Sequence, residues 1–449
     1  MATITQSVST AIELQDRNQV GGRLTKHTGD PTPPENSDAV LQASLAADAE
    51  VPDGGYGWVI ISACAVVAWW FTGTSYCWGV LQAALVKEGV STSSTLAFIG
   101  SLAPACISFL GVINANVIRR LGTRISALLG IFLLGLGQVL SGFTTKNVGG
   151  LFATAGVLFG LGLSICFMVV SAIPAQYFRA KRGIANGMVY AGGGLGGTVI
   201  SFIMNALLGK VGIAWTFRII GFMIWGTGLP AACFIKERVP IQRTQFVERL
   251  FRDIRFALLF AAGAIATFPL FVPPFFLPLY TESMGMNSGV GAGVVAAFNF
   301  SSAVGRLMCG FCSDRLGPLN TLFMSLLLSA LSMLILWPVS TSIGPLIVFV
   351  IINGMGNGGF FSTMPTVVGN VFGSARVSVA MGMIVTSWAG GYLMGAPIAG
   401  YILNASGGED SGISAYRPAI FYAGGMALGA SVLAMFIRLK TDAQPFKKL

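Results

Sequence analysis

Long apolar segments, separated by short polar or basic connections, fill most of the chain after residue 52. A membrane-spanning helix needs about 20 predominantly apolar residues to cross about 30 Å of hydrocarbon. By this measure the pattern predicts twelve spans, six in each half of the chain. Their expected ranges are 57–86, 96–118, 124–144, 148–176, 183–208, 214–235, 256–281, 289–312, 320–340, 344–368, 378–403 and 415–438.

Two short motifs recur along the chain at one common spacing. Arg120-Leu121-Gly122 returns as Arg315-Leu316-Gly317, and Ala185-x-Gly187-Met188 returns as Ala380-x-Gly382-Met383, each 195 residues later. The shared offset indicates two related halves. This organisation is typical of secondary transporters, in which the substrate site lies between the halves near the bilayer midplane. We therefore predict an all-α membrane protein with two pseudo-symmetric six-helix bundles.

The apolar segments also set the expected domain boundaries. The two bundles are expected over 53–235 and 256–438, joined by a cytoplasmic linker at 236–255. Residues 1–52 are polar and rich in Pro, Ser and Thr. Because they hold too little apolar surface to fold, we predict a disordered cytoplasmic tail there. A second, short cytoplasmic tail is expected over 439–449.

Composition agrees with a surface that faces lipid. Of the 449 residues, 54% are hydrophobic and 10% are charged, whereas soluble proteins carry about 25% charged residues. The net charge of +10 does not indicate nucleic acid as a partner, because most Lys and Arg residues fall in connections on one side of the predicted spans. Such residues concentrate on the cytoplasmic side. We expect a multi-pass protein of the plasma membrane, or alternatively the vacuolar membrane, with both termini cytoplasmic.

The predicted spans lack the side chains of a catalytic centre. No nucleophile–base pair, carboxylate pair or metal-ligand cluster falls at membrane depth, and the single histidine, His27, lies in the polar tail. Hydrolytic and redox catalysis therefore lack their parts. We predict neither an enzyme nor a metal or organic cofactor. A membrane enzyme and a transporter-like receptor are the alternatives of another class, and solute flux into reconstituted vesicles separates them from a transporter.

The motif Gly192-x-Gly194-x-x-Gly197 matches a dinucleotide-binding pattern, but its context differs. That fingerprint requires a preceding strand and a helix N-terminus aimed at the pyrophosphate. Here the motif lies inside an apolar helix that begins near Gly183. Small residues at this spacing let membrane helices pack closely. We interpret the motif as a helix contact face.

Arg306 is the most informative polar residue within a predicted span. It lies eight residues before Asp314, which places it about 12 Å from the cytoplasmic end of the helix. A guanidinium at this depth normally faces the interior and pairs with an anion or with carbonyl groups. Its planar fork matches a carboxylate. Two roles are open: Arg306 binds an anionic substrate, or it braces helix ends with Asp314 as its partner.

Further candidates for a substrate cavity are amides and aromatic residues. Asn353 and Asn357, spaced i, i+4, place two amides on one face of a glycine-rich span. A glycine-interrupted membrane helix points to a binding site. With Arg306, the predicted substrate-binding residues are Asn299, Asn353, Asn357, Tyr76, Phe361, Trp388 and Tyr392.

Several stretches carry a resemblance to a known family. Pro52-Asp53-Gly54-Gly55-Tyr56-Gly57-Trp58 is similar to the leading signature of the monocarboxylate transporter family, and Tyr177–Gly187 resembles its second signature. Arg306 and Pro397–Gly400 add matches in the second half. The resemblance covers about residues 52–438 and is greatest to the fungal branch. It implies the major facilitator fold, which has two six-helix bundles and works by alternating access.

Charged residues near the predicted cytoplasmic face are expected to control conformation. Asp53 is placed to cap the first helix. The basic residues of the second signature are placed to contact acidic groups or helix C-termini. The predicted conformational residues are Asp53, Arg120, Arg179, Lys181, Arg182, Asp314 and Arg315.

The chain departs from the family at two positions. The resemblance implies a lysine midway along the first span, which residues 71–78 lack, and an aspartate one turn before Arg306, where Ser302 stands. We therefore expect proton coupling to be weak or to depend on the substrate's own carboxyl group. The expected function is export of an anionic or partly apolar organic acid or secondary metabolite. Uptake of a short monocarboxylate or vitamin is the alternative.

Overall fold

The computed structural model describes residues 54–178, 181–238, 254–372 and 377–441. Within these residues the regular elements are helices, and none is a strand. The all-α prediction is therefore confirmed. The predicted tail 1–52 and most of the predicted linker lie outside the described residues.

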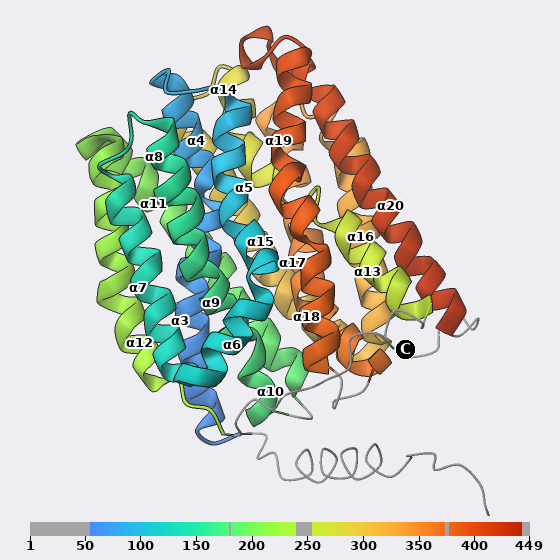
Figure 1. Ribbon diagram of the computed structural model, residues 1–449. Coiled ribbons are helices and arrows are strands. Elements are labelled where there is room, and N and C mark those ends of the chain that lie inside the picture. Colours follow the sequence, from blue (N-terminus) through green and yellow to red (C-terminus); the bar gives the residue numbers. More distant parts are fainter. Residues whose placement is uncertain (1–53, 179–180, 239–253, 373–376, 442–449) are drawn as a thin grey trace, which may run out of the picture. The chain divides into compact units, whose positions relative to one another are not determined.

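The first half of the described chain forms six membrane helices, several of them built from consecutive segments (Figure 1). They are α3 (Gly57–Tyr76) with α4 (Trp78–Lys87), α5 (Ser93–Phe109) with α6 (Gly111–Leu121), α7 (Thr123–Ser141), α8 (Val148–Leu151) with η1 (Phe152–Leu158), α9 (Phe159–Ala172) and α10 (Pro174–Tyr177), and α11 (Arg182–Met223) with η2 (Ile224–Gly228) and α12 (Leu229–Phe234). A straight helix as long as α11 would measure roughly 60 Å, twice the hydrocarbon thickness. It is broken at Gly212, where φ is 77° and ψ is 176°, so the predicted fifth and sixth spans are separate.

The second half repeats this arrangement. Its elements are α13 (Ile254–Ala266) with α14 (Val272–Ser283), α15 (Ser288–Leu316), α16 (Pro318–Leu331) with η4 (Ser332–Leu336), α17 (Ile343–Phe372), α18 (Val377–Ser387) with α19 (Ala389–Ala405), the turns η5 (Glu409–Ser411) and η6 (Ile413–Tyr416), and α20 (Arg417–Thr441). The predicted second, seventh and eleventh spans are each divided into two shorter helices. In the seventh span Pro269 lies within the break, and Pro273 and Pro274 lie in the first turn of α14. Proline provides no N–H for a continuous helix.

The repeated motifs have the same local structure in both halves. Gly122 ends α6 with φ 80° and ψ 161°, and Gly317 ends α15 with φ 95° and ψ 141°. Positive φ favours glycine, because a Cβ would clash there. The offset of 195 residues also relates residues that touch: the rings of Tyr76 and Phe271 lie 5.1 Å apart. Residues that are equivalent and in contact must lie close to the pseudo-twofold axis between the halves.

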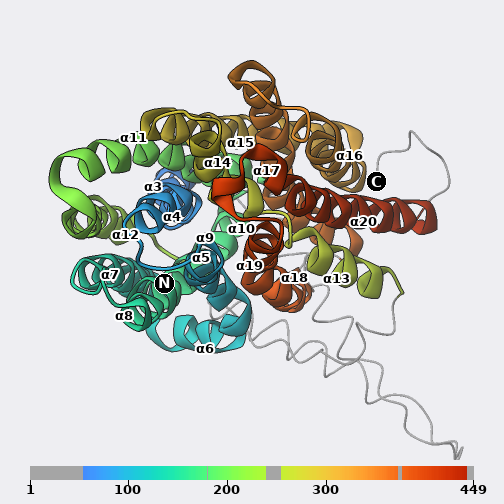
Figure 2. The same cartoon turned by 90° about the horizontal axis from the view of Figure 1, so that it is seen from above.

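Two helix pairs pack together across the boundary between the halves, α11 with α15 and α5 with α19 (Figure 2). The glycine motif of α11 contributes to the first pair. A Cβ added to Gly194 would lie 2.8 Å from the carbonyl oxygen of Asn299, and one added to Gly192 would lie 2.6 Å from the carbonyl oxygen of Ala65 in α3. The interpretation of this motif as a helix contact face is confirmed.

Candidate functional site

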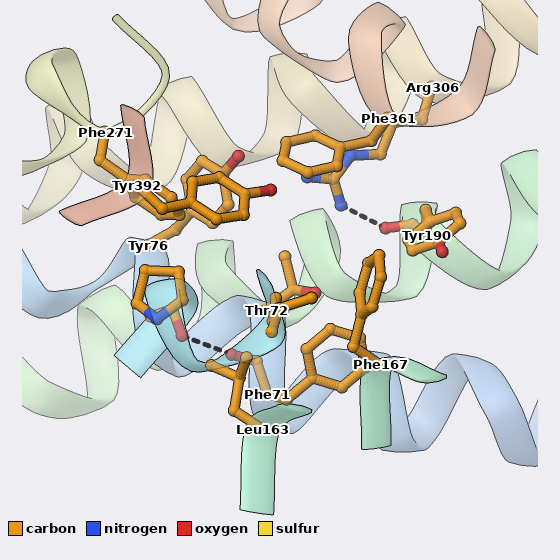
Figure 3. Close-up of a pocket in the computed structure, with 13 residues that line it drawn as sticks. Phe71, Thr72, Tyr76, Leu163, Phe167, Tyr190, Phe271, Arg306, Phe361 and Tyr392 are labelled. Atoms are coloured by element: carbon orange, nitrogen blue, oxygen red, sulfur yellow. Dashed lines mark hydrogen bonds between the residues drawn. The ribbon is translucent and has the colours of Figure 1, made fainter. Parts of the chain in front are cut away.

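A cavity lies between the two halves, near the middle of the helices that surround it (Figure 3). The space within it that the centre of a water molecule can reach is about 30 Å³. The first half contributes side chains from α3, α5, α9 and α11, and the second half contributes side chains from the start of α14 and from α15, α17 and α19. The lining residues are Phe71, Thr72, Ser75, Tyr76, Pro104, Ile107, Leu163, Phe167, Tyr190, Phe271, Arg306, Phe361 and Tyr392.

Arg306 is the one charged residue among these lining residues, and none of them is Asp or Glu. Its side chain is only 1% exposed. The Nη1 group donates a hydrogen bond to the backbone carbonyl of Tyr190, while Nε has no hydrogen-bond partner. The guanidinium carbon lies 5.4 Å from the centre of the Phe361 ring. A carbonyl and aromatic faces therefore stabilise this charge, and no carboxylate among the described residues does.

Tyr76 connects the cavity wall to the other half of the molecule. Its hydroxyl donates a hydrogen bond of 3.0 Å to Oδ1 of Asn357 on α17. The Asn357 amide then donates a 3.0 Å bond to the carbonyl of Leu270. Tyr392, on α19, packs against Phe271 with ring centres 5.6 Å apart. The structure thus brings Arg306, Tyr76, Phe361 and Tyr392 together around one cavity.

Four predicted substrate-binding residues do not line this cavity. One of them, Asn357, instead accepts the hydrogen bond from the Tyr76 hydroxyl. Asn299 is buried against Gly197, where α15 crosses α11. Asn353 donates hydrogen bonds to Ser329 and Ser332, so its amide joins α17 to its neighbour α16 and η4. Trp388 stands behind the cavity wall, 6.5 Å from Phe361. The shared face of Asn353 and Asn357 did not imply a shared neighbour, because α17 meets different helices at successive turns.

Sequence reasoning missed several residues that line the cavity. Phe167 and Tyr190 lie next to each other, with ring centres 6.4 Å apart, and Tyr190 provides the carbonyl that holds Arg306. Phe271 was missed as well, although the sequence contained a signal for it. Its position is 195 residues after Tyr76, and equivalent residues of the two halves meet at the pseudo-twofold axis.

The predicted conformational residues whose side chains the structure describes are Arg120, Lys181, Asp314 and Arg315. They lie away from the cavity, at the end of the bundle where α6 meets α7 and α15 meets α16 (Figure 1). We call this the basic end. Arg120 and Lys181 are exposed there, and the Arg315 guanidinium lies 4.5 Å from the centre of the Phe311 ring. Asp53 and Arg179, and the side chain of Arg182, lie outside the described residues.

Asp314 lies beside the first turn of α11. A Cβ added to Gly183 would be 2.8 Å from its Oδ1 atom, a position where a carboxylate interacts favourably with a helix N-terminus. Arg306 bonds instead to the carbonyl of Tyr190. The expectation that Arg306 braces helix ends with Asp314 is therefore wrong.

The opposite end, which carries Lys87, Ser94 and Asn404, is closed by direct contacts between the halves. The Asn404 amide donates a 2.7 Å hydrogen bond to the hydroxyl of Ser94, and the hydroxyl of Ser93 donates to a carboxylate oxygen of Glu409 at 3.2 Å. Polar side chains from α5 therefore hold the end of α19 and the turn that follows it.

Known proteins share this architecture. The family model described as Major Facilitator Superfamily matches residues 58–318 and 259–448. The aspyridones efflux protein of Emericella nidulans is 29% identical over 410 residues, which cover 88% of this chain and 82% of that protein. The agnestins efflux protein of Paecilomyces divaricatus is 28% identical over 378 residues, which cover 82% and 84%. The crystal structure of the nucleoside transporter NupG matches with a TM-score of 0.67 at 13% identity, over 85% of this chain and 100% of that one.

Proposed function

This chain belongs to the major facilitator superfamily, and from that premise we propose that Arg306 binds the anionic group of an organic acid or secondary metabolite that the protein exports. Family membership makes the chain a multi-pass membrane transporter and not an enzyme. Transporters of this architecture expose a site between their halves to each side of the membrane in turn. The cavity around Arg306 lies between the halves.

One observation carries this proposal: the Arg306 guanidinium is buried at membrane depth and has no carboxylate partner in the part of the chain that the structure describes. A charged side chain at the centre of a membrane costs about 3 kcal/mol even on the lowest scales. One backbone carbonyl and two aromatic faces offset part of that cost. An anion on the free Nε side would supply the missing counter-charge, in the fork geometry that arginine provides.

The lining of the cavity supports a partly apolar substrate. More than half of the lining residues carry an aromatic ring, and such surfaces bind apolar or planar ligand groups. A short monocarboxylate would contact Arg306 but leave most of these rings without a partner. Uptake of such an acid, or of a vitamin, which the resemblance to the monocarboxylate transporter family suggests, is therefore the second candidate.

The direction of transport rests on the relatives. Two of them are named as efflux proteins for aspyridones and agnestins. We infer that this chain also exports its substrate, across the plasma membrane and with both termini cytoplasmic. The basic end would then face the cytoplasm, because Lys and Arg concentrate on that side. We further propose that the two bundles cover 53–235 and 256–438, joined by the linker 236–255.

The test is transport of 1-naphthalenesulfonate into vesicles that contain the purified protein. This probe combines an aromatic ring system with a permanent negative charge, so it cannot cross lipid as a neutral acid. We expect saturable uptake that a pH gradient changes little, because no Asp or Glu lines the cavity. The neutral 1-naphthalenesulfonamide should compete about tenfold more weakly, because it makes no charge-assisted bonds. Equal competition by the two compounds, or no saturable uptake, would contradict the proposal.

A further inference from the structure

The hydrogen bond between Tyr76 and Asn357 links the two halves at the edge of the cavity. Tyr76 comes from α3 in the first half, and Asn357 comes from α17 in the second. Both side chains are almost fully buried, at 2% and 1% exposure. The bond is therefore shielded from competing water, and its loss would leave the Asn357 oxygen without a partner.

This hydrogen bond lies next to a close contact between the two halves on the side of the opposite end. One turn beyond Tyr76, a Cβ added to Gly79 would lie 2.1 Å from the carbonyl oxygen of Pro274, so the backbones of α4 and α14 touch there. Tyr76 also packs on Phe271, the residue that precedes α14. We call these four residues (Tyr76, Gly79, Phe271 and Pro274) the cavity roof. The opposite end opens only if the roof separates.

Tyr76 also faces the proposed anion site. The Arg306 guanidinium carbon lies 5.8 Å from the centre of the Tyr76 ring. Figure 3 shows Tyr76 and Tyr392 on one side of the cavity and Tyr190 on the other, with the Arg306 side chain reaching between them. An anion on Arg306 would therefore lie within reach of the Tyr76 hydroxyl.

We propose that the Tyr76–Asn357 hydrogen bond makes opening of the opposite end depend on the substrate; this rests on the proposed binding of an anion at Arg306. A tyrosine hydroxyl has one proton to donate. Hydrogen bonds to ionised acceptors are roughly twice as strong as those to neutral ones, so the hydroxyl turns from Asn357 to the anion. The buried Asn357 oxygen then lacks a donor, and separation of the roof lets water supply one.

The test measures closure of the opposite end directly. Ser94→Cys combined with Asn404→Cys replaces a pair whose side chains touch there, so oxidation should cross-link the halves while that end is closed. A protease site inserted in the linker 236–255 separates uncross-linked halves on a gel. We expect saturating 1-naphthalenesulfonate to lower the rate of cross-linking about fivefold, as the loss of one buried hydrogen bond predicts. Each cysteine alone should give no cross-link.

Tyr76→Phe keeps the ring but removes the donor. With the two cysteines present, Tyr76→Phe should cross-link slowly even without the probe, and adding the probe should change that rate little. The Kd for the probe should change by a smaller factor than the cross-linking rate. Asn357→Leu should act in the same way from the other partner, and the double variant should add nothing further. Tyr280→Phe is the matched control, because the buried Tyr280 hydroxyl bonds to the carbonyl of Ser340 within the second half.

The outcomes separate this inference from the proposed function. If Tyr76→Phe and Asn357→Leu both keep the parental cross-linking rate and its decrease with the probe, the hydrogen bond has no such role and the inference is wrong. If the parental protein binds no probe, anion binding at Arg306 fails instead. Arg306→Ala should cross-link at the parental rate and ignore the probe, because the hydrogen bond is intact but the anion site is lost.

Discussion

The two halves of this transporter share one backbone plan but carry different chemistry. Gly122 and Gly317 end equivalent helices with nearly the same backbone angles. Yet the residue equivalent to Arg306, 195 positions earlier, is Gly111, where an added Cβ would meet nothing within 4 Å. Likewise, Tyr76 carries a hydroxyl at the position where the second half has Phe271. The charge of the cavity comes from the second half alone, and the roof donor comes from the first.

This difference between the halves separates the features needed for movement, which both halves share, from the charge needed for binding, which only the second half supplies to the cavity. Alternating access needs two similar bundles that move against each other, and the repeated glycines and helix contacts preserve that similarity. Binding of one anion needs one guanidinium, and a second buried charge would add its own desolvation cost without a second ligand to offset it. The repeat therefore keeps its backbone symmetric and concentrates its charge on one side.

Removing the charge that the second half contributes to the cavity should have the largest effect on transport. Arg306→Ala should lower uptake of 1-naphthalenesulfonate about a hundredfold, because a bond to a charged group is worth about 3 kcal/mol. Arg306→Lys should lower it about tenfold, because the charge is kept and the fork is lost. The measurement is the initial rate in vesicles with equal amounts of protein.

Arg218 in the first half is the control for this comparison. Its Nη2 group donates to the carbonyl of Gly142, and its guanidinium lies 4.0 Å from the centre of the Phe143 ring, away from the cavity. Arg218→Lys should change transport little. Normal uptake by well-folded Arg306→Ala would show that the arginine of the second half neither binds the anion nor controls the cycle.

Adding a side chain at the pseudo-twofold axis should have the next largest effect on transport. Gly79 and Pro274 occupy equivalent positions and touch, so Gly79→Ala would keep the opposite end from closing. Overpacking of this kind costs about 1–3 kcal/mol, and transport should fall about tenfold. Cross-linking between Ser94→Cys and Asn404→Cys should fall with it. Gly293→Ala, where a Cβ meets nothing within 4 Å, should leave both rates intact, and equal rates for the two variants would refute the close contact.

The smallest effect concerns a charged pair at equivalent positions, Lys87 and Glu282. Burial raises the pKa of the Glu282 carboxyl above its ordinary value, and the nearby charge of Lys87 lowers the pKa part of the way back. If opening exposes Glu282 to water, the closed state holds the proton more tightly. Closure should then become more favourable as pH falls toward the raised pKa, and this gain should be lost as pH rises above it.

The test of this sign is the rate of cross-linking between Ser94→Cys and Asn404→Cys from pH 7.5 down to pH 5, divided at each pH by the rate of the same pair in Glu282→Gln. The division is needed because the reactive thiolate fraction of the cysteines falls with pH in both proteins. We expect a rise of about twofold, since Glu282 is only half-buried and solvent screens its charge. Glu282→Gln should cross-link faster than the protein with Glu282 at pH 7.5, and at about the same rate as that protein at pH 5. A decrease in closure on acidification would mean that the attraction to Lys87 outweighs the cost of burial.

Much of the fold follows from local properties of the sequence. The twelve predicted spans have counterparts among the described helices, and the offset of 195 residues relates both local backbone structure and contacts between the halves. Less of the cavity could be predicted. Arg306, Tyr76, Phe361 and Tyr392 line it, whereas Asn299 and Asn353 are used in helix packing. Tyr190 gave no signal in the sequence, because its contribution to Arg306 is a backbone carbonyl.

The sequence by itself determined that this protein is a two-fold repeat of membrane helices with Arg306 at membrane depth. Span length, charge distribution and repeat spacing are local or additive properties, so they can be read without knowing which helices touch. Only the tertiary structure decided which side chains share the cavity and that Tyr76 reaches Asn357. In a membrane protein, lipid-facing and interior helix faces are both apolar. The hydrophobic pattern that orients helices in water is therefore weak here, and helix packing alone selects the face that meets the substrate.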